Sequence, residues 1–355
     1  MSLSSLGIAG AAPATAASAV DSVGLRQALS SDAAALASIA ASADSTALVA
    51  TGLSVPAAAL AAAVQTAAGR QGGLSSLFAD LESALQSSAL PPAVADAAEQ
   101  LLGLALPIVP PPSAADLRQA LAQSGLFFEA QLAAGASTPG GDVKSALLDL
   151  ELALQAWTGE TAPRLVADAT VPPPYRGGPL QGQPPAQANL PPDATNAWVG
   201  AQLMQSTSRA LARTVLLQAA SLPRGAKASP EERGPRWRFD IPLDTPAGGA
   251  VAQFEISRDD SGPGGGAGRE PVWQAHFSIH LEPMGPVQAK VALNGDRVRV
   301  TLWADRRDTA DALAAQAGDL TKALADEKLT ATVNVIPAAP VVAAPSPGVL
   351  VDQAL

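Results

Sequence analysis

From residue 236 onward, large apolar side chains recur at every second position, and this alternation limits the possible fold more than any other feature. In the first such stretch, Trp237, Phe239 and Ile241 fall on one face of an extended strand. Arg238 and Asp240 fall on the other face. The same period of two recurs in the stretches 251–257, 273–281, 287–293, 297–304 and 330–336. The pattern predicts about six strands that share one apolar face.

The end of this region has turn and helix signals that complete a fold. Asn294-Gly295 stands between two alternating stretches, which is the sequence signature of a tight hairpin. Residues 309–328 repeat apolar side chains at helical spacing, with Leu313 and Leu320 on one stripe. About 100 residues with this many large apolar positions can bury a core. We therefore expect a compact β-rich domain over 236–337, with about six strands packed against one helix.

The chain before residue 236, which we call the leader (residues 1–235), has a different composition. Hydrophobic residues make up 48% of the whole chain but aromatic residues only 3%, and alanine supplies much of the difference. Alanine buries little area for each residue that must be ordered, so such a chain gains less from folding. Helical spacing and helix breakers predict short helices over 32–43, 56–68, 74–85, 92–104, 113–134 and 142–157. We expect residues 1–157 to be helical and partly disordered.

Proline divides the rest of the leader. Residues 158–192 contain Pro172-Pro173-Pro174, which favours extended polyproline geometry, and are predicted to be a linker. Residues 193–235 are predicted to contain one long helix and a short connection. The residues after the last strand, 338–355, are predicted to be a disordered tail, and the whole chain belongs to the α+β class.

Charge and cysteine content exclude several kinds of function. The net charge is −10 and no cluster of lysine and arginine occurs, so binding to nucleic acid is not expected. The chain has no cysteine, which excludes disulfides, thiolate metal sites and cysteine nucleophiles. No stretch approaches 18 uninterrupted apolar residues, so membrane insertion is not expected. We expect a monomer.

No group of residues has the pattern of a catalytic, cofactor or metal site. His276 and His280 share a face of one predicted strand but lie roughly 13 Å apart at the usual rise, too far for one metal ion. Solvated surface histidines are the simpler interpretation. The glycine-rich stretch 262–268 leads into a strand, whereas a phosphate-binding loop must open a helix. We therefore predict that the protein is not an enzyme and holds no cofactor or metal.

One motif in the strand-rich region resembles a known family. A strand ends in Leu281-Glu282-Pro283-Met284-Gly285-Pro286-Val287, and it is followed by an Ala/Val-alternating strand, a tight turn, a Val-x-Val-x-Leu-Trp-Ala strand and a leucine-spaced helix. This order resembles the C-terminal domain of the flagellar hook-length control (FliK) family over roughly residues 236–336. A weaker resemblance to the N-terminal halves of such proteins covers 124–148. Pro283 and Gly285 force a corner between two core strands.

The resemblance implies a function that composition does not show. Proteins of this family are exported by the flagellar type III apparatus, measure the growing hook, and then switch export from rod and hook subunits to filament subunits. The implied partners are the cytoplasmic domain of the export gate protein FlhB, and the hook and hook-cap proteins during transit. The chain would start in the cytoplasm and pass through the flagellar channel to the medium.

The contact surface for the export gate is expected at the corner and the adjoining strands. The predicted contact residues are Pro283, Met284, Gly285, Pro286, Val287, Val298, Val300 and Leu302. The alternative function, from a different class, is an Ala-rich secreted adhesin or surface-binding protein that uses the C-terminal β domain as a binding module.

Overall fold

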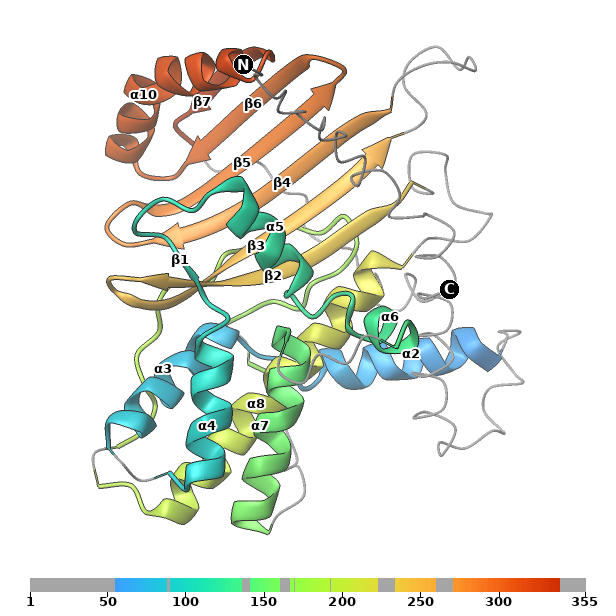
Figure 1. The fold of residues 1–355 in the computed structure, drawn as a ribbon, viewed down its shortest axis with the longest axis vertical. Helices are drawn as coiled ribbons and strands as arrows, with labels where there is room; N and C mark the ends of the chain where they lie inside the picture. Colours follow the sequence, from blue (N-terminus) through green and yellow to red (C-terminus); the bar gives the residue numbers. More distant parts are fainter. Residues whose placement is uncertain are drawn as a thin grey trace, which may run out of the picture.

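The computed structural model describes residues 55–87, 90–135, 141–159, 167–168, 170–191, 193–222, 234–259 and 271–338. The helix predicted over 32–43 and nearly all of the predicted tail lie outside these ranges. The described part is a mixed sheet with leader helices at one end and a C-terminal helix at the other (Figure 1). The α+β class is therefore confirmed.

The sheet has seven strands in the order of the sequence. Strands β2 to β6 form an antiparallel meander, β7 pairs in parallel with β6, and the two-residue β1 pairs in parallel with β2. The strands are β1 (Leu106–Pro107), β2 (Arg236–Thr245), β3 (Gly248–Asp259), β4 (Val272–Leu281), β5 (Gly285–Asn294), β6 (Arg297–Ala304) and β7 (Thr330–Ile336). The six strands expected from the alternation are confirmed, and β1 is an addition from the leader.

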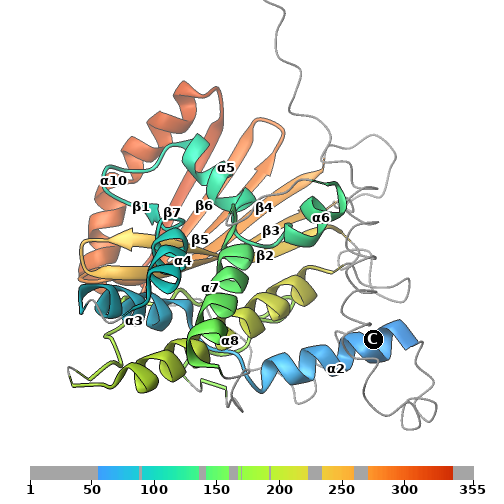
Figure 2. The same cartoon turned by 60° about the horizontal axis from the view of Figure 1, so that its bottom comes forward.

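The predicted hairpin and C-terminal helix are both present. Asn294 pairs with Arg297, so Gly295 and Asp296 form the turn between β5 and β6, and Gly295 has φ 59°. Helix α10 (Arg307–Asp326) then crosses over and returns the chain to β7, parallel to β6. Both ribbon views show α10 lying along β6 and β7 (Figures 1 and 2).

The leader folds into helices that pack together. The helices are α2 (Val55–Ala68), α3 (Leu74–Gln86), α4 (Pro92–Leu102), α5 (Ala114–Ala122), α6 (Phe128–Ala133), α7 (Val143–Thr158) and α8 (Asn196–Ser221). Helices α3, α4, α7 and α8 share a core that has fully buried side chains such as Leu77, Leu147 and Leu203. Asp142 caps α7, accepting a hydrogen bond from the Ser145 amide over 3.0 Å.

The single helix predicted over 113–134 is wrong, because the chain breaks between α5 and α6. Gly125 has φ 79°, a left-handed conformation that interrupts a right-handed helix. Its backbone also lies against α7: a Cβ added at Gly125 would come within 2.8 Å of the Lys144 amide nitrogen. Only glycine permits both the conformation and this close approach.

The apolar face of the sheet is covered at both ends. On the β2 side, Leu106, Ala120 and Leu126 of the leader pack on Phe239 and Ile241. On the β7 side, α10 packs on residues of β5, β6 and β7. Figure 2 shows α5 and α10 on this face of the sheet. The residues that cover this face, in the leader and in α10, come from distant parts of the chain.

The opposite face of β2, which holds the polar side chains of the alternating pattern, is buried. Arg238 is 0% exposed and Asp240 is 7% exposed. Helix α8 and the Pro-rich segment 170–191 pack on this face, and Arg238 donates to the carbonyls of Gly178 and Pro179 over 2.7 and 2.6 Å. Burial lowers the pKa of Arg238 to about 10. Alternation alone could not show that a second layer covers these polar residues.

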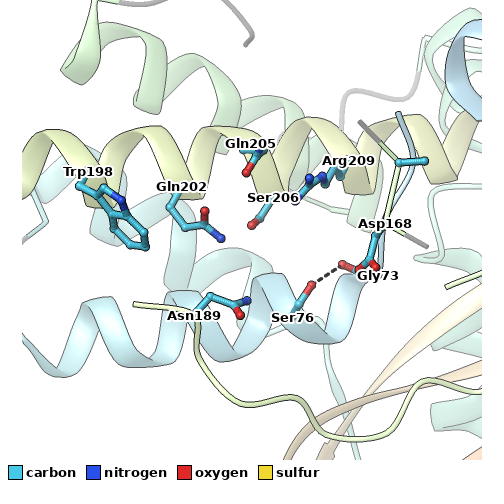
Figure 3. A pocket seen from close by; sticks show the side chains of 10 residues that line it. Gly73, Ser76, Asp168, Asn189, Trp198, Gln202, Gln205, Ser206 and Arg209 are labelled. Atoms are coloured by element: carbon cyan, nitrogen blue, oxygen red, sulfur yellow. Dashed lines mark hydrogen bonds between the residues drawn. The ribbon is translucent and has the colours of Figure 1, made fainter. Parts of the chain in front are cut away.

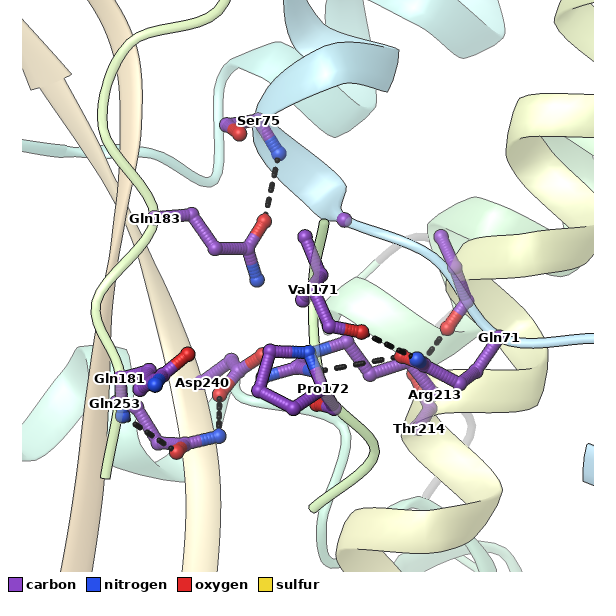
Figure 4. A network of polar contacts seen from close by, with 12 residues as sticks. Gln71, Ser75, Val171, Pro172, Gln181, Gln183, Arg213, Thr214, Asp240 and Gln253 are labelled. Atoms are coloured by element: carbon purple, nitrogen blue, oxygen red, sulfur yellow. Dashed lines mark hydrogen bonds and ion pairs between the residues drawn. The ribbon is translucent and has the colours of Figure 1, made fainter. Parts of the chain in front are cut away.

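The Pro-rich segment 170–191 makes fixed contacts with the strands. Gln183 forms a two-way antiparallel bridge with Val251, at 2.8 and 2.9 Å, beyond the last β3–β4 pair, Gln253–Ser278. The Gly182 amide donates to Oγ of Ser278 over 3.1 Å. Figure 4 shows this segment beside Gln71 and Arg213, in a network that joins α8, β2 and the chain before α3. The domain boundaries remain predictions, but the described part of this segment is bound to the sheet.

Candidate functional site

The predicted contact corner lies between β4 and β5, at Glu282, Pro283 and Met284. The Glu282–Pro283 peptide bond is cis, and Gly285 has φ 75°, a backbone conformation that L side chains rarely adopt. The chain reverses here and enters β5, where Gly285 pairs with Leu281. Pro283 and Met284 are exposed, with 42% of Met284 accessible, so an apolar tip projects from the corner.

Arg306, immediately before α10, holds the corner in this shape. Its two terminal nitrogens contact both carboxylate oxygens of Glu282 at 2.9 and 3.0 Å. It also donates to the carbonyl of Pro283, and Oγ1 of Thr309 donates to the carbonyl of Met284 over 2.7 Å. These contacts tie the corner to the N-terminus of α10. The sequence showed Arg306-Arg307 only as a basic pair before a helix and did not show this contact.

The charges at the corner reinforce one another. The hydrogen bonds from Arg306 hold the pKa of Glu282 below its usual value of 4.5, and His280 contributes in the same direction. Nε2 of His280 lies 3.4 Å from Oε1 of Glu282. Because Arg306 and Glu282 are about half exposed, the ion pair fixes geometry more than it stabilises the fold.

The eight predicted contact residues do not form one exposed patch. Pro283 and Met284 are exposed, Pro286 is half-buried, and Gly285 and Val287 are buried. The other three are Val298, Val300 and Leu302 on β6, of which the two valines are each 5% exposed. Val298 pairs with Leu293 at the opposite end of the β5–β6 hairpin from the corner. Whether any of the eight contacts a partner stays a prediction.

The two histidines differ from their predicted setting. His276 is half-buried rather than solvated; it pairs across the strands with Glu255, and its ring lies 6.4 Å from that of Trp303. Burial lowers its pKa. Its Nε2 and Oε2 of Glu255 are buried and have no hydrogen-bond partner among the described residues. The prediction of a solvated His276 is wrong, because the second face of the sheet is partly covered.

A polar hollow of about 470 Å³ lies between α3, α8 and the Pro-rich segment (Figure 3). Trp198, Gln202 and Arg209 line it from α8, and Asn189 faces them. Beside it, Asp80 is fully buried and accepts hydrogen bonds from the Asn189 amide and the side chains of Gln202 and Ser206. These bonds explain the polar lining as a way of joining three segments of the leader.

Within the ranges that the structure describes, no cluster of three or more histidine, cysteine, aspartate or glutamate side chains could hold a metal ion. Within the same ranges, no helix is both long enough and apolar enough to span a membrane.

Comparison with protein families found one match, which covers the corner and its surroundings. Residues 264–336 match the family described as flagellar hook-length control protein FliK. The matched range contains β4, β5, β6, α10 and β7, and the resemblance noted from the motif is thereby confirmed. Comparison with curated proteins and with solved structures gave no match. The match supports a role in flagellar hook-length control.

Proposed function

Starting from the match of residues 264–336 to the hook-length control family, we propose that this chain is exported by the flagellar type III apparatus, measures the hook, and switches export from rod and hook subunits to filament subunits. The match carries the proposal because it covers a complete structural unit, in which two hairpin strands, a crossover helix and a parallel strand follow β4. In this proposal the chain starts in the cytoplasm and leaves through the flagellar channel. The role is not catalytic.

The leader has properties that suit a measuring segment. It contains no cysteine, so its unfolded chain cannot cross-link during transit. A chain of about 235 residues reaches roughly 750 Å when extended and roughly 350 Å when wholly helical. Its helices are short, apart from α8 with 26 residues, and are rich in alanine. During transit it would contact the hook and hook-cap proteins.

The corner has properties that suit the switching contact. Met284 presents an exposed apolar side chain on a backbone fixed by Gly285 and Arg306. A rigid, exposed apolar tip loses little conformational entropy when a partner covers it. We propose that the partner here is the cytoplasmic domain of the export gate protein FlhB.

Gene deletion tests the function, with hook length measured by electron microscopy of isolated hook–basal bodies. We expect overlong hooks without filaments, restored by the full chain. A chain that ends after residue 259, and so lacks the matched range, should be exported without restoring filaments. Hooks of normal length that carry filaments in the deletion strain would overturn the proposal.

A further inference from the structure

The sheet divides into two halves that have different neighbours. The match covers the half made of β4 to β7 and α10, whereas β2 and β3 lie outside it. The contacts of the leader concentrate on β2 and β3: β1, α5 and α8 contact β2, and α3 contacts β3. The leader therefore closes the end of the sheet that the family match does not include.

The edge of β2 that does not pair with β3 is bound by two parts of the leader. The Ile108 amide, just after β1, donates to the carbonyl of Asp244 over 3.2 Å. Near the other end of the strand, Oγ of Ser221 receives the Arg238 amide hydrogen at 2.8 Å and contacts the Arg238 carbonyl at 3.3 Å. Between these points, Pro242 has no amide hydrogen to offer. Without the leader, β2 would be an open sheet edge.

The apolar face beside this edge is covered by the part of the leader that contains β1. We call residues 104–128 the leader cover. Its buried apolar side chains are Leu106, Ala120 and Leu126, which are 8%, 9% and 3% exposed. They lie on the sheet cluster of Phe239, Ile241, Leu243, Ala250 and Ala252. The cover thus closes the β1 end of the edge and the apolar face together, while Ser221 of α8 closes the other end of the edge.

β1 and α5, the part of the cover nearest the β2 edge, are held by few contacts, whereas the Gln123 carbonyl near the end of the cover accepts a hydrogen bond from the Val143 amide of α7 over 2.8 Å. Strand β1 has two residues, and of the nine residues of α5 only Ala120 is buried. Leu117 is 42% exposed and Val109 is 69% exposed. Segments with few buried apolar contacts open at lower free energy than the whole molecule. We therefore expect β1 and α5 to leave the sheet before the sheet unfolds.

The antiparallel register places the β2 edge near the corner. β2 turns into β3 at Thr245 and Gly248, and Gln253 of β3 pairs with Ser278 of β4, which runs on to the corner at Glu282. The β2–β3 turn and the corner are therefore at the same end of the sheet.

We propose that the leader cover is displaced when the leader is drawn into the channel, and that the freed edge and apolar face of β2 then bind an extended apolar segment of the export gate. This inference rests on the proposed function and adds a second contact surface to the corner. The pattern of the gate segment is inferred from residues 106–108, which occupy the β2 edge in this structure. Leu106 faces the apolar cluster, Pro107 faces out, and Ile108 supplies the ladder hydrogen bond. A partner segment that alternates in this way adds a strand to the sheet.

A reversible lock on the cover provides the test in the full chain. Pro107 and Asp244 are exposed partners on β1 and β2, so Pro107→Cys/Asp244→Cys can form a disulfide outside the core. The chain has no other cysteine to interfere. The matched control is Arg299→Cys/Thr332→Cys, also an exposed pair on parallel strands, which links β6 to β7 and leaves the cover free. Circular dichroism checks that each variant is folded.

The readout is binding to the soluble cytoplasmic domain of FlhB. We expect oxidation of the locked variant to raise its Kd at least about tenfold and reduction to restore it, because only the open fraction binds at this edge. Oxidation of the control pair should leave the Kd unchanged. The variant Leu106→Asp, which places a charge against the apolar cluster, should bind more tightly than the wild type.

Two further outcomes separate this inference from the proposed function. Equal Kd values for the oxidised and reduced lock would overturn the inference and leave the proposed function in place. No binding by any variant, together with normal hooks in the deletion strain, would overturn both. Hydrogen exchange gives an independent reading: amides of residues 236–245 should exchange faster in Leu106→Asp while those of 330–336 do not. Equal exchange in the two proteins would also overturn the inference.

Discussion

Nε of Arg213 on α8 lies 2.6 Å from Oδ2 of Asp240 on β2, and this buried ion pair joins the leader to the sheet. The two side chains are only 3% and 7% exposed. Oδ1 of Asp240 accepts a hydrogen bond from Gln253 over 3.0 Å, so both carboxylate oxygens are occupied. The same guanidinium also donates to the Pro172 carbonyl over 3.2 Å. One arginine thus positions the helix, the sheet and the Pro-rich segment relative to one another.

Replacing Arg213 with methionine should lower the free energy of unfolding by about 3–5 kcal/mol, because Asp240 would stay buried without its partner charge. The double variant Arg213→Met/Asp240→Leu should recover most of that loss, since neither charge is then buried. Urea unfolding followed by tryptophan fluorescence measures both values. Arg297→Ala, at an exposed position, is the control and should change stability by less than about 0.5 kcal/mol. Additive effects of the two core substitutions would show that the pair is not coupled.

Gly285→Ala should destabilise the corner by about 2 kcal/mol, because the residue has φ 75° and an added Cβ would lie 2.8 Å from Nε of Arg306. The control is Gly135→Ala, which has the same φ of 75° but meets nothing within 4 Å. Its cost should be only the conformational part, about 1 kcal/mol. Thermal or urea unfolding compares the two. Equal losses would mean that the contact with Arg306 adds nothing.

Met284→Asp should leave export intact and block the switch to filament subunits. The side chain is 42% exposed, so the substitution places a charge on the surface without disturbing the core. A partner surface that covers an apolar tip would have to desolvate this charge. Secretion of the variant into the medium and the number of filaments per cell are measured together. Normal filament assembly would remove Met284 from the contact surface.

Stability should fall as the pH drops below about 6.5, and His276 should account for part of the fall. Burial lowers its pKa from 6.5, so below pH 6.5 the unfolded chain binds the proton more readily than the folded chain. Its contribution to stability is therefore complete above pH 6.5 and is lost as the pH falls towards its folded pKa. Glu255 and Lys290 pair with it from the two neighbouring strands and act in opposite directions.

The variant His276→Gln tests this pH dependence. It should unfold with a shallower dependence on pH between about 6.5 and 5 than the wild type, because the titrating group is gone. Urea unfolding at a series of pH values gives the two slopes. His280, the other histidine of the chain, is present in both proteins, so the difference reports on His276 alone. Parallel slopes would show that the burial of His276 has no effect on stability.

Helices and strands were predictable from the sequence where the local residue pattern and the tertiary packing favour the same structure. Alternation predicted β2 to β6, Asn294-Gly295 predicted the hairpin, and helical spacing predicted α10 within two residues at each end. The corner was predictable too, since Pro283 and Gly285 restrict the backbone whatever surrounds them. The break at Gly125 was missed because a single glycine does not by itself end a predicted helix. Its contact with Lys144 is seen only in the tertiary structure.

The site was only partly predictable for a related reason. The motif identified the corner, but the hydrogen bonds that hold it join Arg306 to Glu282, which are 24 residues apart in sequence. Val298 and Val300 were expected at a contact surface because their strand adjoins the corner. They are buried, since their face of β6 is the inner one. Alternation identifies the apolar face but not whether another layer covers it.

The sequence by itself determined the strand-rich C-terminal domain, its turn chemistry and the motif of the hook-length control family, because each depends on residues close together in the chain. Only the tertiary structure decided that the leader closes the sheet. β1 pairs with β2 from 137 residues away, as Leu106 with Leu243. Arg238 and Asp240 look solvent-facing until α8 and the Pro-rich segment are placed over them. The free energy of these contacts between leader and sheet depends on which surfaces meet. The apolar and polar pattern of a single segment does not contain that information.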